Sequence, residues 1–202
     1  MTANDVSSQF LSDRTMGLGA GRSSGSTAHR LARLGVGLLL AIGVVFSSVG
    51  HAQDLEDFWD DPFKDLKADV EQARDEGKAG VFAFFEMEEC PFCHRMKTQV
   101  FTDPAVQEYI KENLVTVSID IEGDVMMTTP DGEEMKEKDY AFKEKRVRAT
   151  PVMIFFDTDG ESAVRYTGPT QSPEEFRQLM KFFVSGAYKE PGMNFFKYKK
   201  QQ

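Results

Sequence analysis

Apolar residues form two kinds of run along the chain, and both predict β-strands. Val81–Phe85 and Val152–Phe156 are continuous apolar runs, which are typical of strands buried on both faces. Between residues 115 and 121, valine and isoleucine alternate with polar residues, which predicts a strand with one polar face. The turn sequence Asp157–Gly160 then leads to a short strand expected at residues 163–166.

Three predicted helices share one start signal, a capping residue followed by proline at the first helical position. The three pairs are Asp61-Pro62, Asp103-Pro104 and Ser172-Pro173. The first helix is expected to end near Asp75 and the second near Asn113. The third carries a capping box, with Glu175 three residues after Ser172. Each helix has one apolar face suited to covering a sheet; these faces hold Leu66, Val70 and Ala73, then Val106, Tyr109 and Ile110, then Phe176, Leu179, Met180 and Phe183.

Residues 122–148 form an excursion between the second and third strands. The excursion is expected to contain a loop at Thr129–Gly132 and a charged helix from about Met135 to Lys145. Outside it, strands joined through helices are followed by a hairpin and a last helix. This order predicts a three-layer α/β/α domain around a mixed sheet of about four strands.

The first fifty residues have the pattern of an export signal. Arg30 and Arg33 precede the uncharged run Leu34–Phe46, and small residues follow up to Ala52. The run is shorter than the roughly 20 residues that span a bilayer comfortably. We therefore expect residues 1–52 to be a secretory signal cleaved after Ala52, with a retained membrane anchor as the alternative.

The remaining residues, 53–202, are expected to form one exported domain with a short C-terminal tail. The net charge of the whole chain is −9, whereas nucleic-acid binding requires clustered lysine and arginine. We therefore expect no nucleic-acid partner. Lys197, Lys199 and Lys200 are expected to lie in a solvated tail, and the protein is expected to be a monomer that meets a membrane only through an uncleaved signal.

The chain has two cysteines, Cys90 and Cys93, placed where the strand at 81–85 is expected to lead into a helix. In that helix Cys93 shares the inward face with Met96 and Val100, while Cys90 lies at the N-terminal end. Free backbone N–H groups and the helix dipole favour an anion there, and the thiolate is the form of cysteine that attacks a disulfide. Cys90 is therefore the candidate nucleophile and Cys93 the candidate resolving cysteine of a redox dithiol that needs no metal or other cofactor.

His94 follows the second cysteine and keeps other uses of this motif open. Cys-x-x-Cys-His is also the attachment signature of c-type haem, with His94 as an axial ligand, but haem would need space beside a buried strand and its covering helix. Zinc could bind both cysteines, His94 and a carboxylate, although structural zinc sites usually draw on two separated pairs. A structural disulfide is the third alternative, although the loop that it would close is too short to brace a fold.

Two segments resemble the hallmarks of the thioredoxin superfamily: Cys90-Pro91-Phe92-Cys93 at a strand-to-helix junction, and Thr150-Pro151 leading into an apolar strand. The resemblance covers roughly residues 64–188 and implies a thioredoxin-like fold. It also implies that Pro151 is a cis-proline beside the dithiol and that the backbone of Thr150 pairs with an extended substrate. A narrower similarity is to periplasmic thioredoxin-related proteins of the SoxW type, associated with bacterial sulfur oxidation; it rests on the export signal, on His94 after the dithiol, on Asp131-Gly132-Glu133 and on the Phe-Phe-Asp-x-x-Gly turn.

The sequence departs from thioredoxins at two positions near the dithiol. Glu89 stands where thioredoxins have tryptophan, and Phe84 stands where many of them hold a buried acid. Proton transfer to Cys93 would then require Glu86 or water. The usual first strand of the family is also not evident.

The resemblance implies a thiol–disulfide oxidoreductase that reduces protein disulfides. Because no glutathione buffer holds the periplasm reduced, such a reductase needs a membrane electron donor as a second partner. The alternatives are a disulfide oxidase or isomerase, a c-type haem protein or haem chaperone, and a thioredoxin-fold binding module without turnover.

Overall fold

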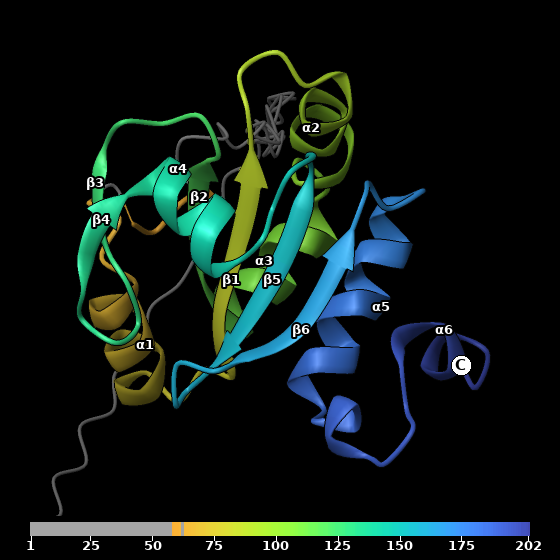
Figure 1. Ribbon diagram of the computed structural model, residues 1–202. Helices are drawn as coiled ribbons and strands as arrows, with labels where there is room; N and C mark the ends of the chain where they lie inside the picture. The colour runs from red at the N-terminus through yellow and green to blue at the C-terminus, as the bar shows by residue number, and fades with distance from the viewer. Residues whose placement is uncertain (1–57, 62) are drawn as a thin grey trace, which may run out of the picture. The chain divides into compact units, whose positions relative to one another are not determined.

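The computed structural model of the protein describes residues 58–61 and 63–202, so the expected signal and its cleavage site lie outside the described residues. Four strands form the central sheet in the order β2-β1-β5-β6 (Figure 1). β1 pairs in parallel with β2 and antiparallel with β5, and β5 pairs antiparallel with β6. The predicted mixed sheet of about four strands is confirmed; its members are β1 (Gly80–Glu86), β2 (Leu114–Asp120), β5 (Val152–Asp157) and β6 (Ser162–Thr167).

Helices cover both faces of this sheet, as the apolar stripes predicted. α1 (Leu66–Asp75) packs Leu66, Val70 and Ala73 into a core with alternate residues of β1, including Phe85. On the other face, α3 (Pro104–Asn113) and α5 (Pro173–Val184) enclose Phe82 and Phe84. None of the helices in the described part of the chain has the length and apolar character that crossing a bilayer requires.

Two of the three predicted helix starts are confirmed. Asp103 accepts hydrogen bonds from the backbone N–H groups of Ala105 and Val106, and the hydroxyl of Ser172 accepts one from Glu175. The first start was wrong: α1 begins at Leu66, with Asp65 as its cap. Lys64 has a φ of 60°, a left-handed conformation that a continuous helix does not contain.

The excursion contains a hairpin that its sequence pattern did not predict. β3 (Met126–Thr128) pairs antiparallel with β4 (Glu134–Lys136) around the expected loop. The helical part therefore begins later than Met135, as α4 (Glu137–Asp139) followed by the π-helical turn η3 (Tyr140–Glu144). Strands of three residues are too short for an alternating pattern to reveal them.

The two outer strands of the sheet are partly covered by the ends of the described chain. Residues 58–61 lie along β2, where the backbone N–H of Asp60 donates to the carbonyl of Thr116 at 3.0 Å. At the other end, the expected solvated tail folds into the short helices η4 (Ala187–Lys189) and α6 (Phe195–Lys199). Phe195 is buried against the core, and Lys199 forms a 2.6 Å ion pair with Glu175 of α5.

Asp61 and Asp69 form a buried acidic pair beside α1, and each is only 5% exposed. Oδ1 of Asp61 accepts hydrogen bonds from the backbone N–H groups of Phe63 and Lys64, both at 2.7 Å. Among the described residues, Oδ2 of Asp61 and Oδ2 of Asp69 have no hydrogen-bond partner. Burial and the neighbouring Asp61 raise the pKa of Asp69 to about 8. A proton on Asp69 supplies the donor that this pair of carboxyl groups otherwise lacks.

The acidic pair makes the free energy of unfolding depend on pH. An unfolded aspartate loses its proton near pH 4, whereas folded Asp69 keeps it to about pH 8, so stability falls as the pH rises through this window. We expect Asp69→Asn to gain stability relative to the wild type as the pH increases from 4 to 8, measured by urea unfolding. The control is Asp75→Asn, at an exposed position of the same helix; a pH-independent difference for Asp69→Asn would contradict the assignment.

Candidate redox site

The two cysteines are joined by a disulfide at the N-terminal end of a helix. Cys90 is the cap of α2 (Pro91–Arg95), which continues directly into the π-helical segment η2 (Met96–Val100). The S–S distance is 2.09 Å and the Cα atoms lie 5.2 Å apart. The backbone N–H of Cys93 donates to Sγ of Cys90 at 3.0 Å. In the reduced protein the same N–H can stabilise a thiolate on Cys90, because a donor aimed at the charged form favours that form.

Burial distinguishes the disulfide from its immediate surroundings. Cys93 is 1% exposed and Cys90 is 6% exposed, so Cys90 is less open to solvent than its place at the helix end suggested. Both cysteines belong to the core cluster that includes Phe84 and Met96. Phe92, between them, is 56% exposed. Pro91 and His94 are exposed as well, and the backbone N–H of His94 donates to the carbonyl of Cys90 in the first turn of the helix.

The peptide bond between Thr150 and Pro151 is cis, as the family resemblance implied. Val152, the next residue, pairs with Phe85 in the antiparallel register of β5 and β1. The loop that ends at Pro151 therefore meets the sheet at the edge from which the chain leaves β1 for Cys90. Figure 1 shows this start of β5 below α2.

Thr150 keeps its hydrogen-bonding groups free within the described residues. Neither its backbone N–H nor its carbonyl forms a hydrogen bond there, and its buried hydroxyl has no partner. By contrast, the carbonyl of Pro151 accepts a hydrogen bond from the N–H of Gly168 at 2.9 Å. The loop is thus attached to the sheet through Pro151, and Thr150 retains one donor and one acceptor on its backbone.

Glu86, the last residue of β1, lies on the same face of the sheet as Phe82 and Phe84, because side chains alternate along a strand. That face carries the helix with the disulfide. One carboxylate oxygen of Glu86 forms a 2.6 Å ion pair with Lys97 of η2, and the other accepts a hydrogen bond from the hydroxyl of Ser118 at 2.7 Å. Glu86 therefore joins β1 to the helix, and its role in proton transfer stays a prediction.

Arg95 makes a contact that sequence reasoning missed. Its guanidinium donates to the carbonyl of Thr170 at 2.5 Å, and the hydroxyl of Thr170 donates to the sulfur of Met96 at 3.6 Å. These bonds attach the helix with the disulfide to the segment after β6, which also holds Pro151 through Gly168. Only the basic side chain of Arg95, two residues after Cys93, hinted at such a contact, because its acceptor lies 75 residues away.

An exposed cation–aromatic pair lies on the segments that lead to Thr150. The guanidinium of Arg148 stands 5.1 Å from the ring centre of Phe142, which is 55% exposed. Arg148 directly precedes Ala149 and Thr150 in the chain, so this pair and Phe92 place two exposed aromatic rings on the segments that carry the dithiol and the cis-proline.

Comparison with known proteins identifies the family to which this fold belongs. A sequence profile described as a thioredoxin-like domain matches residues 66–183, more than half of the chain. The protein therefore belongs to the thioredoxin-like domain family. It carries a Cys90–Cys93 disulfide that is consistent with thiol–disulfide oxidoreductase activity.

One solved structure supports the same fold, and two others are similar over a shorter part of the chain. A thioredoxin-fold protein from Helicobacter pylori has a TM-score of 0.56 at 18% identity, covering 74% of this chain and 90% of its own. A putative disulphide-isomerase from Bacteroides thetaiotaomicron has a TM-score of 0.46 at 24% identity, covering 60% of this chain and 91% of its own. A thioredoxin from Thermus thermophilus has a TM-score of 0.45 at 24% identity, covering 63% and 92%. The chain matches no curated protein.

The bond from Arg95 gives a test of how the disulfide helix is anchored. Arg95→Met keeps most of the aliphatic stem but removes the charged donor to Thr170, so we expect the free energy of unfolding to fall by about 1–2 kcal/mol. Chemical denaturation of the oxidised protein measures this loss of stability. The control is Arg177→Met, which removes a surface ion pair with Glu174 and is expected to cost at most about 0.5 kcal/mol. Equal losses in the two variants would contradict an anchoring role for Arg95.

Proposed function

We propose that the protein is an exported thiol–disulfide oxidoreductase that reduces protein disulfides through Cys90 and Cys93. The observation that carries the proposal is the helix-terminal disulfide itself, in which the N–H of Cys93 points to Sγ of Cys90. A thiolate at that position is stabilised by the N–H and by the helix dipole. A purely structural disulfide would not require this placement.

In the reducing direction, the Cys90 thiolate attacks one sulfur of a substrate disulfide. The bond between Cys90 and that sulfur forms, the substrate S–S bond breaks, and the other substrate sulfur leaves as a thiolate that takes up a proton. The Cys93 thiolate then attacks Sγ of Cys90 and releases the second substrate thiol. Two electrons have passed to the substrate, and the Cys90–Cys93 disulfide is restored.

The substrate is proposed to lie across Thr150 in an extended conformation. Support comes from the free backbone N–H and carbonyl of Thr150, which offer one donor and one acceptor to a peptide strand. Phe92 adds an exposed apolar contact beside the disulfide. Because this contact is largely backbone-directed, the proposed substrates are unfolded or locally extended protein segments rather than one small molecule.

Reduction requires that the Cys90–Cys93 disulfide is itself reduced after each turnover. The proposed electron source is a membrane dithiol donor, which follows from the proposed export to the periplasm, where no thiol buffer serves as reductant. The proposed pathway is one associated with sulfur oxidation, supported only by the motif similarity to SoxW-type proteins. The export signal in residues 1–52 lies outside the described residues.

The surroundings of the cysteines support covalent haem attachment less well than thiol–disulfide exchange. Covalent attachment would require the sulfurs of both cysteines to reach the haem edge. The side chain of Cys93 is 1% exposed and packs with Met96 and Phe84, so haem would have to displace part of this core. An absorbance spectrum of the purified protein tests this alternative independently of the exchange assay.

Trapping of intermediates tests the assignment of the two cysteines. With Cys93→Ser, the mixed disulfide on Cys90 cannot be resolved, so we expect substrate proteins to accumulate on the variant in the native envelope. Non-reducing electrophoresis and mass spectrometry detect and identify them. Cys90→Ser is the matched control and is expected to trap nothing. Accumulation on Cys90→Ser instead would mean that the roles of nucleophile and resolving cysteine are reversed.

The direction of electron flow gives a separate prediction. A reductase is expected to have a reduction potential nearer to the about −270 mV of thioredoxin than to the about −120 mV of a strong disulfide oxidant. Equilibration of the wild type against a glutathione series measures the potential, and insulin reduction with dithiothreitol measures activity. A potential near the oxidant value would identify a disulfide oxidase. Failure of the wild type to reduce insulin, together with no trapping, would identify a binding module.

A further inference from the structure

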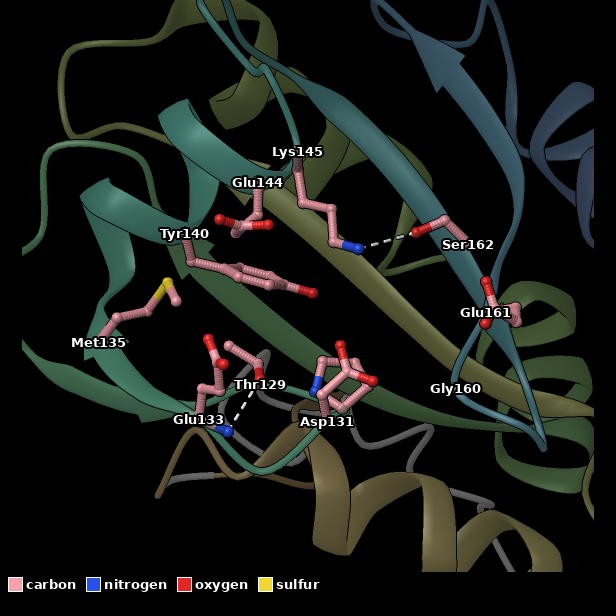
Figure 2. A pocket seen from close by; sticks show the side chains of 11 residues that line it. Thr129, Asp131, Glu133, Met135, Tyr140, Glu144, Lys145, Gly160, Glu161 and Ser162 are labelled. Atoms are coloured by element: carbon pink, nitrogen blue, oxygen red, sulfur yellow. Dashed lines mark hydrogen bonds between the residues drawn. The ribbon is translucent and has the colours of Figure 1, made fainter.

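A polar cavity of about 160 Å³ lies between the loop of the excursion, the turn η3 and the beginning of β6. Figure 2 shows the side chains that line it. Tyr140, in its wall, belongs to the core on the α1 side of the sheet, whereas Cys90 and Cys93 belong to the core on the other side. The cavity is therefore separate from the redox site.

The hydroxyl of Tyr140 is an unsatisfied group in the wall of this cavity. Tyr140 is 1% exposed, and its hydroxyl has no hydrogen-bond partner in the described chain. Figure 2 shows the hydroxyl pointing into the space between Lys145 and Asp131. Burying a hydroxyl without a hydrogen-bond partner costs free energy. A ligand that supplies the missing partner removes this cost, which favours its binding.

Lys145 stands beside this hydroxyl with most of its donors unused. Its ammonium donates to the hydroxyl of Ser162 at 3.0 Å and lies 5.2 Å and 4.9 Å from the ring centres of Tyr140 and Phe156. Among residues 58–61 and 63–202, no carboxylate lies within ion-pair distance of it. An ammonium has three donors. Lys145 and Tyr140 thus form a pair of donors suited to a carboxylate.

The rim of the cavity is negatively charged, opposite to the ammonium of Lys145. Its four carboxylate side chains are exposed and form no ion pair with any described residue; they are Asp131, Glu133, Glu144 and Glu161. Such a rim attracts a cation and repels a simple anion. A ligand that satisfies both the rim and the inner donors must carry both charges within a short distance.

We propose that this cavity binds a small zwitterion, an α-amino acid, with its carboxylate on Lys145 and Tyr140 and its ammonium toward the acidic rim. The volume corresponds to roughly five water-sized groups, which fits glycine or alanine. This site is independent of the dithiol chemistry, so it does not rest on the proposed function.

Ligand titration of the full-length oxidised protein, followed by calorimetry or by NMR, tests the proposal. The probes are glycine and alanine, with ethylamine as the cation alone and propionate as the anion alone. We expect the two amino acids to bind at least about tenfold more tightly than the other two probes, because each of those lacks one charge. Equal binding of ethylamine and alanine would overturn the proposal, as would no binding of the amino acids at millimolar concentrations.

Two variants connect binding to the named donors. Tyr140→Phe keeps the ring and removes only the hydroxyl, and we expect it to weaken alanine binding about tenfold. Lys145→Met removes the ammonium and is expected to weaken binding further. Lys143→Met is the matched control, because Lys143 lies in the same turn, pairs with Asp139 and does not line the cavity. Unchanged affinity in correctly folded Tyr140→Phe would contradict the proposed contact, and insulin reduction by this variant, expected to be unchanged, separates the result from the redox function.

Discussion

The antiparallel pairing of β1 with β5 is the constraint on which the candidate redox site depends. The register pairs Phe85 with Val152, so the end of one strand meets the beginning of the other at a single edge of the sheet. At that edge the chain leaves β1 toward Cys90, and it enters β5 through Thr150 and Pro151. A shift of the register by one residue would also turn every side chain of a strand to the opposite face, so the two buried cores fix the register that brings these two segments to one edge.

β1 also separates the candidate redox site from the polar cavity. Phe82 and Phe84 point into the core that contains Cys93, while Phe85 points into the core that contains Tyr140. Because Cys93 and Tyr140 belong to different cores, the disulfide and the polar cavity lie on opposite sides of β1. This strand thereby separates the proposed redox chemistry from the proposed ligand binding.

The strands with long apolar runs could be predicted from the sequence, because a strand buried on both faces has apolar residues at nearly every position. The dithiol could be placed for a related reason, since Cys90 comes shortly after such a run, which ends at Phe85. The contact between Arg95 and Thr170 could not, because it joins segments 75 residues apart without any local pattern. The hairpin of β3 and β4 was missed because Met127 is the one buried residue in its three-residue first strand. The inner donors of the polar cavity, Tyr140 and Lys145, lie at η3, and only the fold brings them to Ser162 of β6.

Glu86 is the candidate to take the part of the buried acid that many thioredoxins hold near the dithiol. Phe84 occupies the position where many thioredoxins hold a buried acid, and it lies in the core with Cys93, where an unpaired carboxylate would be costly. Two residues later, on the same face of the strand, Glu86 carries its charge at the margin of that core, where Lys97 and Ser118 both bind it. Both carboxylate oxygens of Glu86 are already bound, so Glu86 could accept a proton from Cys93 only through water or by loosening its bond to Lys97. The reactivity of Cys93 would then depend on an ion pair between a strand and a helix rather than on an acid buried beneath it.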